Sequence, residues 1–182
     1  MFEFIPKIME EDAQLKAVSE AIAQLKRLDV LVGVPEGGED RKAGAASNAE
    51  LVYIHTNGSP IRGIPARPII EPAILDGKDV LGEKLSKAYE TALAGNTAGV
   101  RPALEKAGQA AQNIVRDWFT NPKNNWAELK TAAEERREKK MSKSALAKAK
   151  KRAEEDKSFV VHRPLIDTGE MRKSIVYVVR EI

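Results

Sequence analysis

The sequence predicts an α+β fold, in which a small, mostly antiparallel sheet is covered by two or three helices and a charged helical arm is attached. Three observations lead to this expectation. Apolar residues recur at helical spacing in several segments, two short β-branched segments lie near opposite ends of the 182-residue chain, and the segment before the second is highly charged. We expect one domain formed by residues 1–129 and 158–182, with the arm (residues 130–157) inserted before the C-terminal strands.

The N-terminal part of the chain predicts a helix followed by a buried strand. A helix is expected over residues 12–28, with Asp12 as its cap and an apolar face at three- and four-residue spacing formed by Leu15, Val18, Ile22 and Leu25. Residues 29–35 are short, apolar and β-branched, and Pro35 ends them, which is typical of a buried strand. Residues 36–46 are rich in Gly and charge, which predicts an exposed loop.

The next segments predict two short helices on either side of an extended stretch. Residues 48–57 favour a helix that Gly58 ends. Residues 59–68, which we call the proline loop, contain Pro60, Gly63, Pro65 and Pro68, and this density of helix breakers predicts an extended chain. A new helix is expected over residues 69–75, because Pro72 is tolerated in a first turn.

Residues 78–93 and 100–119 are the two longest predicted helices. The second keeps one apolar face, formed by Leu104, Ala107, Ala111, Ile114, Val115 and Trp118. Four of its residues are small and would let another element approach closely: Ala107, Gly108, Ala110 and Ala111.

Beyond these helices the amino-acid composition and the charge of the chain change. Residues 126–157 consist mostly of Ala, Glu, Lys and Arg, which favour helix, but they offer few large apolar residues to a core. Residues 123–157 hold 12 Lys or Arg and 7 Asp or Glu, so they carry a net charge of +5 in a chain whose total is +3. Strands are expected over residues 158–162 and 174–180, the latter pairing with the strand at 29–35.

Composition argues against several classes of function. The chain has no cysteine and only two histidines, His55 and His162, which leaves little for a metal site or for acid–base chemistry. The N-terminus does not resemble a signal peptide, and no apolar run is long enough to cross a membrane. We therefore expect no enzyme, no cofactor, no metal and no membrane partner.

The sequence Leu-Ile-Asp-Thr-Gly at residues 165–169 resembles the catalytic signature of aspartic proteases, in which two carboxylates share a proton across a dimer. A dimeric protease is therefore one alternative function. However, only 13 residues follow Gly169, too few for the flap and strands that such a fold still needs. The alternative that we favour is a structural turn of Asp167, Thr168 and Gly169 that leads into the last strand.

The arm raises another alternative, a DNA-binding protein. Its basic residues are candidates for contacts with DNA or with a protein partner: Arg136, Arg137, Lys139, Lys140, Lys148, Lys150, Lys151 and Arg152. The acidic residues among them favour a solvated helix face or a protein-docking surface. Because the arm lacks a stripe of large apolar residues, we expect it to fray in the free chain and to become ordered on a partner.

Four pieces of the sequence, in this order, are similar to one protein family. They are Val-Gly-Val-Pro at residues 32–35, the helix and its glycine at 48–58, Gly-Ile-Pro-Ala-Arg-Pro-Ile at 63–69, and the segment at 164–175 that contains Leu-Ile-Asp-Thr-Gly. Together they resemble the tail-completion or neck proteins of long-tailed bacteriophages, also called phage virion morphogenesis proteins. The chain departs from that pattern in Thr56-Asn57, where the family usually has Glu-Phe or a similar pair, and in its long basic arm.

The resemblance implies a structural subunit of the head–tail connector, located in the virion neck and in the host cytoplasm during assembly. It implies a ring of roughly six or twelve copies. The ring would lie between head-connector and tail-terminator or tail-tube proteins, with DNA in its passage. The stiff proline loop is the expected interface, through Pro60, Arg62, Ile64, Pro65, Arg67 and Pro68. Arg67 is expected either to bind a carboxylate of a neighbouring subunit or to form a salt bridge within its own chain.

Overall fold

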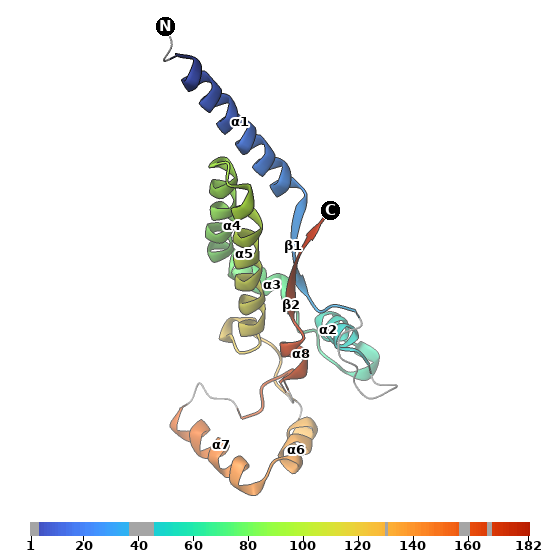
Figure 1. Cartoon of the computed structure of the whole chain (residues 1–182). Coiled ribbons are helices and arrows are strands. Elements are labelled where there is room, and N and C mark those ends of the chain that lie inside the picture. Colours follow the sequence, from blue (N-terminus) through green and yellow to red (C-terminus); the bar gives the residue numbers. More distant parts are fainter. Residues whose placement is uncertain (1–3, 37–45, 130, 157–160, 167–168) are drawn as a thin grey trace. The chain divides into compact units, whose positions relative to one another are not determined.

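The protein is described by a computed structural model that covers residues 4–36, 46–129, 131–156, 161–166 and 169–182 (Figure 1). The chain forms two compact units. Unit 1 comprises Met1–Gly33, Ile70–Val115 and Ile175–Ile182, and unit 2 comprises Val34–Ile69 and Arg116–Ser174. This division differs from the predicted one, because the arm belongs to the same unit as the proline loop.

Unit 1 holds both strands and most of the long helices. Its elements are α1 (Phe4–Lys26), β1 (Leu28–Gly33), α3 (Ile70–Asp76), α4 (Lys78–Leu93), the larger part of α5 (Thr97–Trp118) and β2 (Val176–Glu181). The expected helix at 12–28 starts earlier, at Phe4, so the prediction that Asp12 caps it is wrong. Pro6 falls in the first turn of this helix, where a missing N–H is tolerated.

The two described strands pair antiparallel, which confirms the predicted long-range pairing and the α+β class. Val30 lies opposite Val179, and Leu31 lies opposite Val178. Helix α5 covers the outer edge of β2 with two side chains. The Gln112 side-chain oxygen accepts a hydrogen bond from the Tyr177 N–H at 3.1 Å, and Arg101 donates to the Val179 carbonyl at 3.2 Å. These bonds satisfy backbone groups that a third strand would otherwise pair.

Small residues bring the elements of unit 1 close together. A Cβ atom on Gly108 would lie 2.4 Å from the ring of Tyr177, so only glycine allows α5 to approach β2 this closely. Alanines dominate the neighbouring core, where Ala21 of α1 and Ala88 and Ala92 of α4 are fully or almost fully buried. The prediction that small residues in the second long helix permit close packing is confirmed.

Unit 2 is built from short helices around an aromatic core. Its elements are α2 (Asn48–Asn57), 3₁₀ turns at Pro60–Arg62 and Pro122–Asn124, α6 (Thr131–Lys140), α7 (Lys143–Glu155) and α8 (Glu170–Lys173). The predicted helix 48–57 is confirmed, and it begins with reciprocal hydrogen bonds between Ser47 and Glu50. Large buried side chains of this unit include Phe119, Ile69 and Trp118.

The prediction that the proline loop is extended is wrong for part of the loop. A 3₁₀ turn at Pro60–Arg62 interrupts it, and Ser59 pairs with Ile64 across that turn. The reason is local: Pro60 stands at the first position, where its fixed φ suits a helical turn, and Gly63 follows with a φ of 61°. The loop is therefore a closed hairpin-like turn.

The C-terminal region of unit 2 also differs from expectation. Within residues 126–157, which favour helix, the structure describes two helices, α6 and α7, separated at Met141 and Ser142, and the Ser142 hydroxyl caps α7. Of the strand expected over residues 158–162, only Val161 and His162 are described, and they form a bend. Among the described helices, none combines the length and the apolar character that crossing a membrane requires.

Candidate functional site

The candidate site is the surface around Arg67, where the proline loop meets α2 and the segment after Trp126. Arg67 is 5% exposed, although the sequence places it among prolines in a surface loop. Its Nε and Nη2 atoms donate to the Ala127 carbonyl at 3.2 and 2.8 Å, and Nη2 also lies 3.3 Å from the Glu128 carbonyl. The planar guanidinium thus ties the loop to a segment about 60 residues further along the chain.

This arrangement corrects the expectation that Arg67 binds a carboxylate of a neighbouring subunit. The side chain is buried and already donates to backbone carbonyls of its own unit, so its role is internal. The other expectation is a salt bridge within the chain. The contacts of Arg67 are indeed internal, but its partners are carbonyls rather than a carboxylate. Burial, and then the charge of Arg137, lower the pKa of Arg67.

A second anchor of the proline loop is the carbonyl of Pro68. It accepts hydrogen bonds from the indole N–H groups of both tryptophans, at 3.3 Å from Trp118 and 3.1 Å from Trp126. Trp126 also packs edge-to-face against Phe119, with ring centroids 5.7 Å apart. Residues 67 and 68 are therefore held from two sides, which fixes the end of the loop.

His55 completes the inner side of the loop. Its carbonyl accepts a 2.6 Å hydrogen bond from the Arg67 N–H. The Nδ1 atom of its ring is buried, and among the described residues it has no hydrogen-bond partner. Burial, followed by the nearby positive charge of Arg67, lowers the pKa of His55, which favours the neutral ring.

These residues border an open groove of about 540 Å³ on unit 2. Its walls also include Ile64, Pro65 and Leu129, so it is largely apolar. Among the residues predicted to form an interface, Pro60, Arg62, Pro65 and Pro68 are exposed and Ile64 is half-buried. These five are accessible to a partner, whereas Arg67 is buried and forms hydrogen bonds within its own unit.

The predicted turn at residues 167–169 is only partly covered by the structure. Asp167 and Thr168 lie outside the described residues. Gly169 has a φ of 78°, a left-handed conformation that favours glycine, and it directly precedes α8. The position of Gly169 agrees with a structural turn that feeds the last strand.

Two arginines fasten α8 to the end of α5. The Nε atom of Arg172 donates to the Arg116 carbonyl at 2.7 Å, and its Nη2 atom lies 3.1 Å from the Asp117 carboxylate. In return, Arg116 donates to the Lys173 carbonyl at 2.9 Å. The Met-Arg-Lys sequence after Gly169 gave no indication of this reciprocal arrangement, which joins residues more than 50 positions apart.

The basic residues of the arm fall into two groups. Most have exposed side chains: Arg136, Lys139, Lys140, Lys148, Lys150, Lys151 and Arg152. Arg137 does not belong with them. It is half-buried and donates to the Arg163 and Ile166 carbonyls at 2.7 and 3.0 Å, so the expectation that it contacts DNA or a partner is not supported. It fastens α6 to its own unit instead.

Within the described part of the chain, no three His, Cys, Asp or Glu side chains lie close enough to hold a metal ion. Comparisons with protein-family models, with curated proteins and with solved structures found no match to this chain.

Proposed function

We propose that the chain is a structural subunit of the head–tail connector of a long-tailed bacteriophage, a neck or tail-completion protein that joins head and tail as part of a ring. The observation that supports this most is where the four pieces of sequence that carry the resemblance lie in the structure. Three of the four lie mostly or wholly in unit 2 and contact one another, although they are spread over residues 48–175.

The contacts between these pieces are specific. Helix α2 packs against α8, which joins the second piece to the fourth. Gly58, at the end of the second piece, lies so close to the third that a Cβ there would be 2.8 Å from the Ala66 nitrogen. The third piece supplies Arg67, whose N–H binds the His55 carbonyl. The residues shared with the family therefore serve one local architecture, as expected if the resemblance reflects a common fold.

The proline loop supplies what a repeated protein contact requires. Its exposed prolines have a fixed φ, the turn is closed by the Ser59–Ile64 bridge, and Arg67 and Pro68 anchor its end. A surface that is already rigid loses little conformational entropy when a partner binds. This favours a role as an assembly interface.

A DNA-binding protein remains the second candidate, because eight exposed Lys and Arg side chains lie on α6 and α7. Neighbouring acids reduce their effect. Glu138 pairs with Lys150 at 2.9 Å, and Glu155 pairs with Lys151 at 3.8 Å. Tight binding to duplex DNA that weakens steeply as salt rises would favour this candidate over the connector.

The connector proposal is tested by deleting the gene from the phage that encodes it. We expect filled heads and free tails that do not join, and restored joining when the purified protein is added. Arg62→Glu should fold normally and join poorly, because Arg62 is exposed on the proline loop. Lys87→Glu, on the exposed surface of α4, serves as a matched control with the same change of charge and should join normally. Normal particles from the deletion strain would contradict the proposal.

A further inference from the structure

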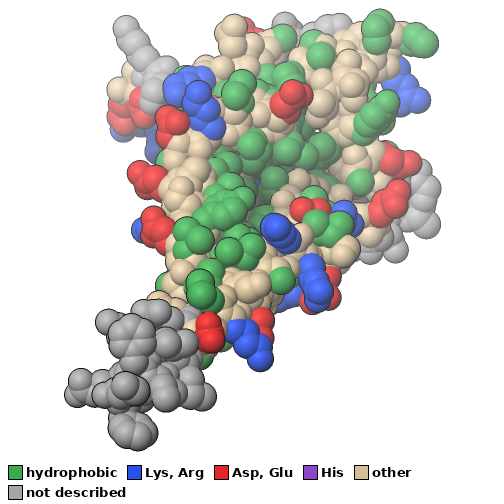
Figure 2. All heavy atoms as spheres, turned by 90° about the horizontal axis from the view of Figure 1, so that it is seen from above, with side chains coloured by type: hydrophobic (Ala, Val, Ile, Leu, Met, Phe, Trp, Pro, Cys, Tyr) green, Lys and Arg blue, Asp and Glu red, His purple; other side chains and the backbone are tan. Residues whose placement is uncertain are grey.

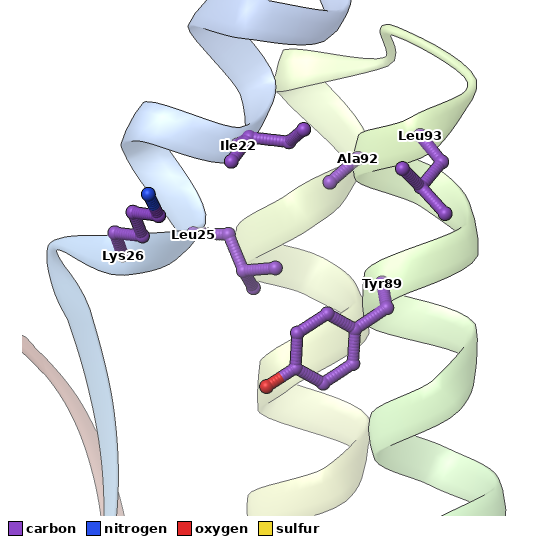
Figure 3. A pocket seen from close by; sticks show the side chains of 6 residues that line it. All are labelled: Ile22, Leu25, Lys26, Tyr89, Ala92 and Leu93. Carbon is purple, nitrogen blue, oxygen red and sulfur yellow. The ribbon is translucent and has the colours of Figure 1, made fainter.

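Unit 1 carries a second apolar surface, which none of the sequence pieces discussed above accounts for. A groove of about 230 Å³ lies between α1 and α4 and is lined by Ile22, Leu25, Lys26, Tyr89, Ala92 and Leu93 (Figure 3). Large apolar side chains at its border are exposed to solvent, with Tyr89 at 60% and Leu93 at 63%. We call this the α1–α4 groove. Figure 2, a view from above, shows hydrophobic side chains gathered on that face of the chain.

Helix α4 presents these side chains as a continuous stripe. Leu85, Tyr89 and Leu93 follow one another at four-residue spacing, and all three are exposed. Ala88 and Ala92, on the adjoining face of the helix, are buried in the core of unit 1. A stripe of this kind beside a buried face is the usual receptor for the apolar face of another helix.

The same unit also carries a helix, α1, that is exposed over residues 12–16, part of the half that lies away from the core. The turn between α4 and α5 meets α1 at Ala17, where a Cβ on Gly95 would lie 3.1 Å from the Ala17 Cβ. Helix α1 starts at Phe4, so residues 4–16 continue beyond that turn, over about 20 Å (Figure 1). Residues 12–16 are all exposed, and Leu15 is 68% exposed.

The projecting half of α1 has the sequence of a docking helix. Leu15, Val18 and Ile22 follow one another at three- and four-residue spacing. This spacing puts apolar residues on one side of a helix. The stripe that begins on the projecting half thus continues into the residues that line the groove.

We propose that the α1–α4 groove of one copy of the chain receives the projecting half of α1, residues 4–16, from a second copy. Charge supports this occupant. Residues 4–16 hold three acids and two lysines, a net charge of −1, whereas Lys26 and Arg27 are exposed at the end of α1 beside the groove. One such contact covers both apolar surfaces at once, whereas groove-to-groove pairing of two copies would leave the projecting helix uncovered.

This contact joins two different surfaces, so an associated pair still has one free helix and one free groove. Head-to-tail contacts of this kind form a ring where the rotation between copies closes, and an open filament where it does not. The inference deepens the proposed function, on which its ring rests, by naming the surface through which copies associate. The contact itself is a property of the purified chain.

Cysteine cross-linking tests the contact directly, because the chain has no cysteine of its own. The Leu15→Cys chain is mixed with the Leu93→Cys chain and oxidised, and we expect a covalent dimer. The control mixture pairs Leu15→Cys with Tyr53→Cys, whose site is 72% exposed on α2. Cross-linking that is no faster than in this control would overturn the inference. So would faster cross-linking between two Leu93→Cys chains, which indicates groove-to-groove pairing.

A second variant distinguishes a loss of the contact between copies from a loss of folding. Leu15→Asp should leave thermal unfolding unchanged, because Leu15 is exposed, and should weaken self-association in sedimentation by about tenfold. Unchanged association would contradict the inference. If the cross-link forms but the deletion strain still joins heads to tails, the contact stands and the connector function fails. If joining is lost and no cross-link forms, the connector function stands without this interface.

Discussion

Replacing Arg67 by alanine should destabilise unit 2, because the structure makes Arg67 an internal clamp. The substitution removes a buried charged donor that serves the carbonyls of Ala127 and Glu128 and leaves those carbonyls with fewer partners. Hydrogen bonds from charged groups contribute about 1.5–3 kcal/mol, and the lost aliphatic stem adds to this. We expect a loss of about 3–4 kcal/mol in the free energy of unfolding, which is a large part of the stability of a typical domain.

Urea unfolding followed by tryptophan fluorescence is a suitable assay. The only two tryptophans of the chain, Trp118 and Trp126, both bind the carbonyl next to Arg67, so their emission reports on this clamp. The midpoint should fall by about 1–2 M. Arg62→Ala, in the same loop but exposed, is the matched control and should leave the midpoint unchanged. Equal midpoints for both variants and the parent chain would refute the internal role of Arg67.

Three further outcomes are expected. Gly108→Ala should destabilise unit 1 by about 1–3 kcal/mol in urea unfolding, because its Cβ would collide with Tyr177, whereas Gly82→Ala in open space should be neutral or stabilising. The lowered pKa of His55 means that the unfolded chain binds a proton more readily than the folded one. Stability should therefore be fully present above pH 6.5 and decline below it, and His55→Gln should flatten this profile. Arg137→Ala should speed hydrogen exchange in α6 while the amides of α5 stay protected.

The regular elements of the chain were predictable because their signals are local. The helix at 48–57 follows from residues that favour helix and from the Gly58 that ends it, and the pairing of β1 with β2 follows from two β-branched segments that both need a partner. The start of α1 is not evident from the sequence, because Pro6 disfavours a helix interior but is tolerated in a first turn. The density of Pro and Gly in the proline loop argues against a long helix, but it is compatible with the 3₁₀ turn at Pro60–Arg62.

Only part of the candidate site could be predicted from the sequence. Sequence reasoning singled out the proline loop, but it assigned Arg67 to the outside, since arginine between prolines is typical of an exposed loop. Its burial depends on backbone carbonyls about 60 residues away, and carbonyls have no sequence signature. The same holds for Arg137 in the arm and for the two indoles that share the Pro68 carbonyl. The apolar spacing of α1 was visible, but the groove beside it required the packing of α4.

The central claim, that this chain is a connector subunit, is tested most directly by locating it in the particle. Virions of the encoding phage are imaged by electron cryo-microscopy, and the structure of the chain is fitted to the density at the junction of head and tail. We predict a closed ring of copies at that junction, with the proline loop in contact with a neighbouring protein. Complete, joined particles in which no density and no peptide of this chain can be found would contradict the account.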